Sequence, residues 1–191
     1  MTAHSLPLPS ESLVISTAQA FDADPRYGPS DRALASEFSR FPLNDTLEEV
    51  LIKVVLLNTL YNTNVFAVVE MAAHIRDLAI DQDLSTASPA LVDKIARLSI
   101  RGKERRHYSF ATKYCSWHNP NDFPIYDGLV DRVLWLYQKE KSYAHFSRPE
   151  LQDYVKFKAV LAAFRQRYGL AGISAKQLDK FLWYTAKRLR L

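Results

Sequence analysis

Apolar residues recur at three- and four-residue intervals along most of the chain, and this spacing predicts α-helices. Leu47, Leu51, Val54 and Val55 share one face of a predicted helix over residues 46–60. The start, Thr46-Leu47-Glu48-Glu49, matches a capping box, in which a hydroxyl and a carboxylate bond to exposed backbone N–H groups. We therefore expect a buried helix that begins close to Thr46.

The remaining pattern predicts an all-α protein, with only five glycines in the chain. Residues 1–30 indicate a loosely structured lead with one short helix near Ser12–Phe21. A capping box formed by Ser174 and Gln177 opens the last predicted helix. The other predicted helices run from Val65 to Ile75, from Pro89 through Leu91, Ile95 and Leu98, over Tyr108–Trp117, and over about 149–168 and 174–190.

Asp127-Gly128 supports two interpretations. It is a typical two-residue turn of a β-hairpin. The apolar residues that follow, Val130, Val133 and Leu134, continue instead at helical spacing. We therefore interpret Asp127 as the N-cap of a helix, preceded by an extended apolar segment.

Composition narrows the class of protein. The 191 residues suit one compact domain or two small lobes that share a core. The single cysteine, Cys115, provides neither a disulfide nor a cysteine-bound metal cluster. Cys115 and His118 have a ligand-like spacing, but a packed thiol explains Cys115 better. Lys53 interrupts the best apolar run, and the N-terminus has no secretory pattern. We expect a cytoplasmic monomer with no membrane partner, no metal and no cofactor.

Charge is concentrated in one segment. The formal net charge is +4, whereas the segment from Lys94 to Lys113 alone carries +6. It is equally well interpreted as a solvated connection between helices or as a surface that binds phosphates. Its basic residues are Lys94, Arg97, Arg101, Lys103, Arg105, Arg106 and Lys113.

The run Phe123-Pro124-Ile125-Tyr126-Asp127-Gly128-Leu129-Val130-Asp131-Arg132-Val133-Leu134 resembles the catalytic segment of helix-hairpin-helix DNA glycosylases. Within that superfamily it is most similar to the adenine DNA glycosylases. The resemblance implies a two-lobed, all-α glycosylase-like domain over 1–191. A central helical lobe would span about 46–134, and a second lobe would combine about 1–45 with 135–191.

The resemblance implies a catalytic role for Asp127, which matches the family's essential aspartate. Ser109 aligns with the position where bifunctional members carry a Schiff-base lysine, so the chain resembles the monofunctional enzymes that use water. Two departures are clear. Residues Arg101–His107 replace the family's glycine-rich hairpin, and the four-cysteine iron–sulfur cluster of the closest relatives is absent.

Double-stranded DNA is the partner that follows from the resemblance. Arg101, Lys103, Arg105, Arg106 and His107 would contact phosphates in place of the glycine-rich hairpin. Lys113 would bind a phosphate or act as a displaced lyase nucleophile, and phosphate contact requires fewer assumptions. Residues proposed to line the base pocket or intercalate are Asn58, Tyr61, Asn62, Trp117 and Tyr126.

The expected activity is hydrolysis of the N-glycosidic bond of a damaged or modified base, which leaves an abasic site. Hypermodified bases of phage DNA belong to this substrate class, so both repair and defence against foreign DNA are compatible roles. The alternative is a DNA-binding module that keeps the fold without catalysis. A helical protein-interaction domain without a nucleic-acid partner fits the basic segment least well.

Overall fold

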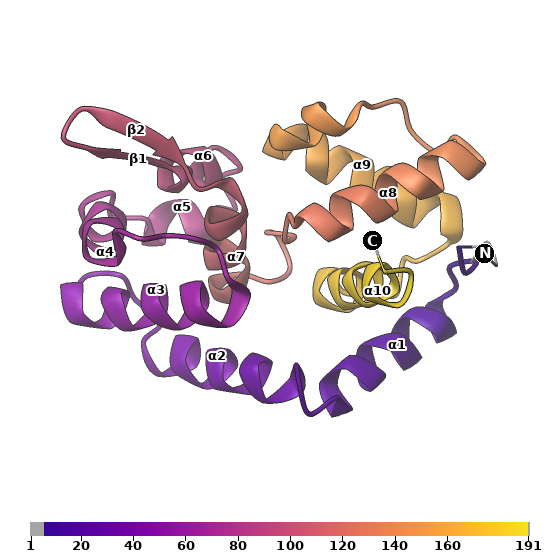
Figure 1. Ribbon diagram of the computed structural model, residues 1–191, viewed down its shortest axis with the longest axis horizontal. Coiled ribbons are helices and arrows are strands. Elements are labelled where there is room, and N and C mark those ends of the chain that lie inside the picture. The colour runs from indigo at the N-terminus through magenta and orange to yellow at the C-terminus, as the bar shows by residue number, and fades with distance from the viewer. Residues whose placement is uncertain (1–5, 191) are drawn as a thin grey trace. The chain divides into compact units, whose positions relative to one another are not determined.

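The computed structural model describes residues 6–190; residues 1–5, the start of the predicted lead, and Leu191 lie outside the described part. Within it the chain is mainly helical, which confirms the all-α class apart from one small hairpin (Figure 1). None of the described helices has the length and apolar character needed to cross a membrane. The elements are α1 (Glu11–Ala23), α2 (Gly28–Arg40), α3 (Leu47–Tyr61), α4 (Val68–Asp77), α5 (Asp81–Ser85), α6 (Ala90–Ala96), β1 (Arg97–Ile100), β2 (Lys103–Arg106), α7 (Tyr108–His118), α8 (Gly128–Lys141), the 3₁₀-helix η1 (Arg148–Gln152), α9 (Tyr154–Tyr168) and α10 (Ala175–Arg188).

The chain divides into two compact units. The hairpin unit is Pro25–Ile125 and contains α2 to α7 with both strands. The terminal unit combines the described residues up to Asp24 with those from Tyr126 onward, so it contains α1, α8, η1, α9 and α10.

The buried face of α3 differs from the predicted one. Leu47 and Leu51 are only half-buried and Val55 is exposed, whereas Val50, Val54 and Leu57 are fully buried. Thr46 is the N-cap residue as expected, but its side chain makes no capping hydrogen bond, so no capping box forms. Lys53 faces inward beside Val54, which rotates the buried stripe away from the one that apolar residues alone predict.

The buried ammonium group of Lys53 fixes the segment between α2 and α3. Lys53 Nζ donates to the carbonyl oxygens of Phe41 (3.1 Å) and Leu43 (2.6 Å) and to Asn44 Oδ1 (2.8 Å). Asn44 in turn donates its backbone N–H and its side-chain amide to the Asp81 carboxylate. Burial lowers the pKa of Lys53 to about 8 although nearby carboxylates oppose the shift. These bonds compensate for removing the ammonium from water.

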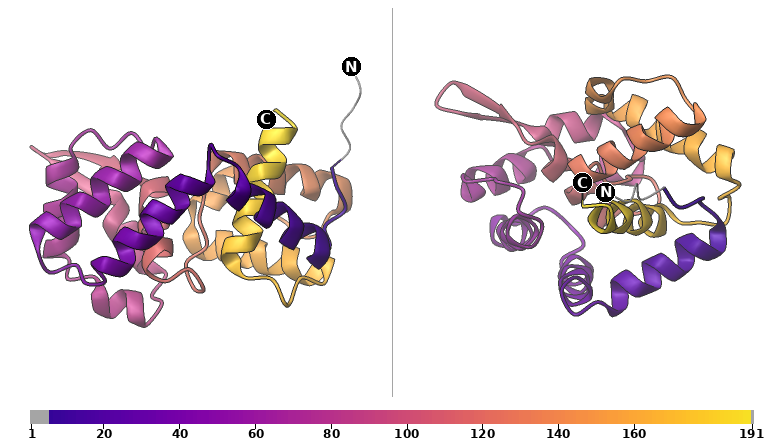
Figure 2. Two further views of the ribbon diagram at one scale, coloured as in Figure 1. Left: turned by 90° about the horizontal axis from the view of Figure 1, so that it is seen from below. Right: turned by 45° about the vertical axis from the view of Figure 1, so that its right-hand side comes forward.

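A β-hairpin occupies the segment that the sequence predicts as the end of one helix and a connecting loop. Helix α6 ends at Ala96, so Leu98 lies in β1 and not in the helix expected from the Leu91, Ile95 and Leu98 spacing. The turn residues Arg101 (φ 50°) and Gly102 (φ 74°) both have positive φ, as a two-residue type I′ turn requires. Both views in Figure 2 show the hairpin extending from the helices of its unit.

The terminal unit shows that the lead is more ordered than predicted. Ser10 caps α1, whose buried residues Val14 and Ala18 lie on the side that packs against α10. The predicted helix over 149–168 is divided, because Asp153 ends η1 and caps α9. Asp127 is the N-cap of α8 and Ser174 forms its capping box with Gln177, so both of these predictions are confirmed.

His118 gives the hairpin unit a defined pH dependence. Burial, with a smaller effect of nearby Lys53, lowers the pKa of His118 to about 3 from an ordinary value of 6.5. Between these values the unfolded chain binds a proton that the folded chain does not, so acidification destabilises the fold. We expect His118→Gln to reduce the loss of unfolding free energy between pH 6.5 and 5 by about 1 to 2 kcal/mol. Urea unfolding at several pH values measures this difference, and parallel curves for the two proteins would contradict it.

Candidate functional site

The register of the hairpin sorts its cations onto two faces. Successive side chains of a strand point to opposite sides, so residues paired across the hairpin share a face. Leu98, Ile100, Lys103 and Arg105 lie on what we call the open face. The opposite, paired face carries Arg97, Ser99, Glu104 and Arg106.

Cations of the paired face are neutralised within the molecule. Arg97 bonds to Asp93 (2.6 Å) and to Glu104 (3.0 Å), and Arg106 bonds to Asp93 (3.0 Å). The Arg106 guanidinium also lies 4.5 Å from the centroid of the Tyr108 ring. The two guanidiniums lower the pKa of the Asp93 carboxyl. Arg106, a predicted phosphate contact, is therefore engaged with its own chain.

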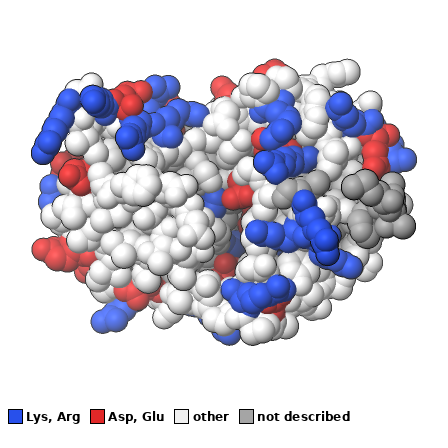
Figure 3. Space-filling model, in the orientation of Figure 1, with Lys and Arg blue, Asp and Glu red and all other residues white. Residues whose placement is uncertain are grey.

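Cations of the open face have no such partners. Within residues 6–190, the side chains of Lys103 and Arg105 make no hydrogen bond or ion pair, and the same holds for Arg101 in the turn. Figure 3 shows blue side chains over the hairpin at the upper left, with acidic groups interspersed. Within the hairpin, the positive charge that is available to an external anion thus comes from the open face and the turn.

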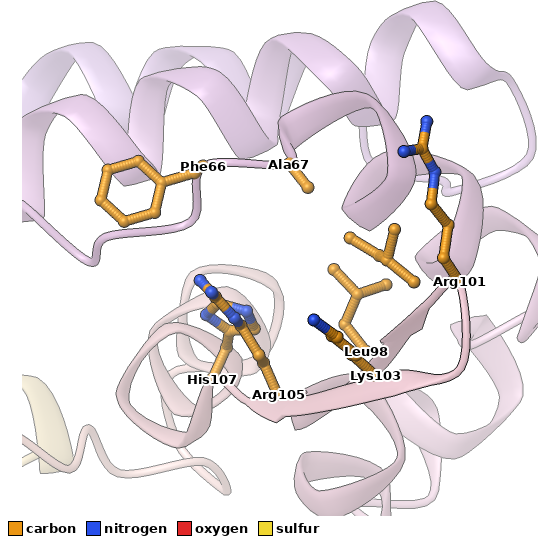
Figure 4. Close-up of a pocket in the computed structure, with 8 residues that line it drawn as sticks. Phe66, Ala67, Leu98, Arg101, Lys103, Arg105 and His107 are labelled. Carbon is orange, nitrogen blue, oxygen red and sulfur yellow. The ribbon is translucent and has the colours of Figure 1, made fainter.

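A cavity of about 310 Å³ lies against this open face. Leu98, Ile100 and Ala67 provide apolar lining, and no acidic residue lines it. Figure 4 shows Phe66 and Ala67 along one side and the basic side chains with His107 along the other. Burial, and then the Arg105 charge, lower the pKa of His107, so the imidazole is neutral near pH 7. The cavity combines apolar contact area with cations, as sites for small anionic ligands do.

Phe66 is the residue of this cavity that sequence patterning misses. Its side chain is 82% exposed, which is unusual for a phenylalanine in a chain with a well-formed core. Phe66 does not fit the helical spacing of the apolar residues Val65, Val68 and Ile75. It lies in the loop between α3 and α4. An aromatic residue that interrupts such a pattern in a loop is the signal that would have identified it.

Three predicted site residues come together in the hairpin unit. Lys113 Nζ donates to Ser109 Oγ (2.6 Å) one turn earlier on α7 and lies 5.5 Å from the centroid of the Tyr61 ring. Tyr61 donates its hydroxyl to Asp31 Oδ1 on α2 (3.2 Å). Lys113 is only 1% exposed, although it carries a charged ammonium group.

Asn58 and Asn62 shape the loop between α3 and α4. Asn58 Oδ1 accepts from the Val65 backbone N–H (2.9 Å) and the Thr63 hydroxyl (2.9 Å), while its Nδ2 donates to the Val65 carbonyl (3.0 Å). Asn62 is exposed and ends α3 in the left-handed conformation, with φ 50°. Asn58 therefore braces the loop that presents Phe66.

Trp117 and Cys115 belong to the packed part of α7. The Trp117 ring lies 6.1 Å from that of Phe38, and Phe38 also packs against Tyr114 and His118. Cys115 is fully buried, which raises the pKa of its thiol, and it forms no disulfide. The interpretation of Cys115 as a packed thiol is confirmed.

Asp127 stands at the N-terminus of α8 in the terminal unit. Its Oδ1 accepts a hydrogen bond from the Leu129 backbone N–H (2.9 Å), and the residue is half-buried. A side-chain carbon placed on the adjacent Gly128 would meet no atom within 4 Å. The carboxylate thus sits where the helix dipole favours negative charge, and the residue directly precedes a glycine with open space around its α-carbon.

An ion pair between a buried carboxylate and an exposed arginine supports this end of α8. Asp131, which is 5% exposed, receives two hydrogen bonds of 2.9 Å from the Arg148 guanidinium. Tyr126 donates its hydroxyl to Asp131 (3.3 Å) and accepts from Gln152 (2.7 Å). Burial, followed by the Asp131 charge, raises the pKa of Tyr126 to about 12. Tyr126, which directly precedes Asp127, is therefore linked to η1 through Gln152.

The protein is thus helical, with a basic β-hairpin and a carboxylate at the N-terminus of α8. Residues 13–122 match the model of the HI_0787_N family, described as an N-terminal domain. A Haemophilus influenzae (strain ATCC 51907 / DSM 11121 / KW20 / Rd) protein described as "Uncharacterized protein" is 42% identical over 149 residues, which cover 77% of this chain and 71% of that protein. The chain belongs to the HI_0787_N family. No solved structure matches it.

The Asp131–Arg148 pair yields a stability prediction. Arg148→Met leaves the buried Asp131 carboxylate without its bidentate partner, and we expect a loss of about 2 to 3 kcal/mol in the free energy of unfolding. Arg132→Met is the matched control, because Arg132 is an exposed arginine on the same helix. It should change the free energy by less than about 0.5 kcal/mol. Equal losses in urea unfolding would show that the ion pair has no special role.

Proposed function

We propose that this protein is a DNA glycosylase with a two-lobed, glycosylase-like fold that removes a damaged or modified base and leaves an abasic site. The observation that carries the proposal is Asp127, a half-buried residue whose carboxylate caps the N-terminus of α8. It ends the apolar run Phe123–Tyr126 and begins the helical run through Leu134, in the order that resembles the glycosylase catalytic segment.

Cleavage of an N-glycosidic bond develops positive charge on the sugar, and a fixed carboxylate stabilises that charge. In the proposed reaction, water adds its oxygen to the anomeric carbon as the bond to the base breaks, and the departing base takes up a proton. Asp127 would face the developing charge and orient the water. The hydrogen bond from the Leu129 N–H holds the carboxylate in one orientation, which supports such a role.

Hydrolysis by water is proposed over covalent catalysis by lysine. Ser109 stands at the position that resembles the Schiff-base lysine of bifunctional enzymes. The nearby Lys113 donates a hydrogen bond to Ser109 and is almost fully buried, and both observations favour a positioning role. The product should therefore be an intact abasic strand.

Replacing Asp127 by asparagine tests the role of its charge. Asparagine is also a favourable N-cap, so the fold should be retained while the negative charge is lost. We expect the excision rate to fall about 10²- to 10³-fold, with duplex affinity nearly unchanged. The assay incubates duplexes that contain different modified bases and reveals abasic sites by strand scission in mild alkali.

Asp153→Asn provides the matched control, because Asp153 caps α9 through the same kind of side-chain bond. It should leave excision unchanged. Full turnover by Asp127→Asn would reject the mechanism, and scission without alkali would reject the assignment to water. Salt-sensitive DNA binding by a wild-type protein that excises no base would instead indicate a non-catalytic DNA-binding module.

The unpaired cations of the open face test how the protein binds the phosphate backbone. Lys103 and Arg105 have no partner in the described chain and are available to phosphates, whereas Arg97 and Arg106 are paired with acids. Replacing Lys103 and Arg105 by Met should weaken duplex binding and reduce the slope of log K against log salt concentration by about 2. Fluorescence anisotropy over a salt series measures both quantities.

The matched control replaces Arg97 and Arg106 by Met, which removes the same charge from the other face of the same strands. The slope of log K against log salt concentration should then change by less than about 1. If the salt slope decreases by the same amount in the two double variants, then net charge and not the open face determines binding.

A further inference from the structure

The cavity beside the hairpin combines features that a surface for backbone phosphates alone does not require. An array of cations is sufficient to bind phosphates. Here the cations border an apolar floor formed by Leu98 and Ile100, and Phe66 lies at the opposite side (Figure 4). A ligand that fills this cavity has to present an aromatic or apolar group together with negative charge.

The Phe66 ring is accessible to a ligand that stacks on it. Its ring is 82% exposed, so it contributes little to the core. The loop that carries it is braced by the three hydrogen bonds of Asn58. An exposed ring on a fixed backbone loses little conformational freedom when a flat ligand stacks on it.

The charged side chains that line the cavity are all basic. Arg101, Lys103 and Arg105 line it, none of them is paired within residues 6–190, and no carboxylate lines it. Burial, and then the nearby Arg105 charge, lower the pKa of His107, which favours a neutral imidazole that can still form hydrogen bonds. A volume of about 310 Å³ lies at the low end of small-ligand pockets and suits one ring system.

We propose that this cavity holds one unpaired nucleotide of a DNA strand, with its base against Phe66 and the apolar floor and its phosphate on Lys103 and Arg105. Cations interleaved with an aromatic ring are the usual means of binding single-stranded nucleic acid. The residues that line the cavity all belong to the hairpin unit, whereas Asp127 belongs to the terminal unit. This site rests on the proposed function only in taking DNA as the ligand, and it requires no cleavage.

The experiment separates recognition of the base from recognition of the phosphate. Fluorescein-labelled oligothymidylate of about eight nucleotides and an abasic chain of the same length are titrated with the wild-type protein. We expect the thymidine chain to bind about 5- to 100-fold more tightly, which corresponds to the stacking of one base. Phe66→Ala should abolish this preference while leaving the affinity for the abasic chain unchanged.

Two further variants keep the test specific. Val69→Ala removes an exposed apolar side chain from the neighbouring helix α4 and should preserve the preference. Phe66→Trp should restore it, since indole also stacks. Lys103→Met should weaken the binding of both chains by the same factor, because both carry phosphates.

Equal binding of the two chains by the wild type would overturn the proposal, as would a preference that survives Phe66→Ala. Thymidine monophosphate that binds as tightly as the octamer would also overturn it, because the ligand would then be a free nucleotide. Loss of excision assigned to Asp127 does not affect these outcomes. Failure of the nucleotide site is thus distinguishable from failure of the glycosylase proposal.

Discussion

The two-residue turn at Arg101-Gly102 is the constraint on which the surface chemistry of the hairpin unit depends. Positive φ at both positions fixes the pairing of Ile100 with Lys103, and alternation then determines the face of every other side chain. A shift of β2 by one residue would place Lys103 and Arg105 on the face that carries Arg97, and it would bring Glu104 and Arg106 to the cavity. The turn therefore determines which charges are neutralised and which remain available.

Much of the helical framework could be predicted because its signals are local. Asp127 and Ser174 are recognised as N-caps from a polar side chain before an apolar periodic run, and the structure has both of them bonded to the backbone of their helices. Such bonds reach only two or three residues along the chain. The division of the predicted helix at Asp153 shows the limit, since the same residue both ends η1 and opens α9.

Other features depend on partners that are distant in sequence. Lys53 interrupts an apolar run, yet it is buried because the carbonyls of Phe41 and Leu43 converge on its ammonium group. Leu98 fits helical spacing, but strand pairing with Arg105 overrides that preference. Phe66 is left exposed by a loop whose shape depends on Asn58. Tertiary contacts decided each case, and periodicity contains no information about them.

The two proposed sites place different demands on the chain. A catalytic carboxylate has to be held in one orientation, and Asp127 has this property through the Leu129 N–H and the Tyr126, Asp131 and Arg148 contacts that support α8. A nucleotide site has to admit a ligand and release it, so exposed cations and an exposed ring suit it better. The family match covers the hairpin but ends at residue 122, before Asp127. The alignment with the Haemophilus influenzae protein covers 77% of the chain and therefore extends past Asp127. Neither comparison names a function, so the proposals for both sites rest on their geometry and, for Asp127, on the resemblance of the segment around it.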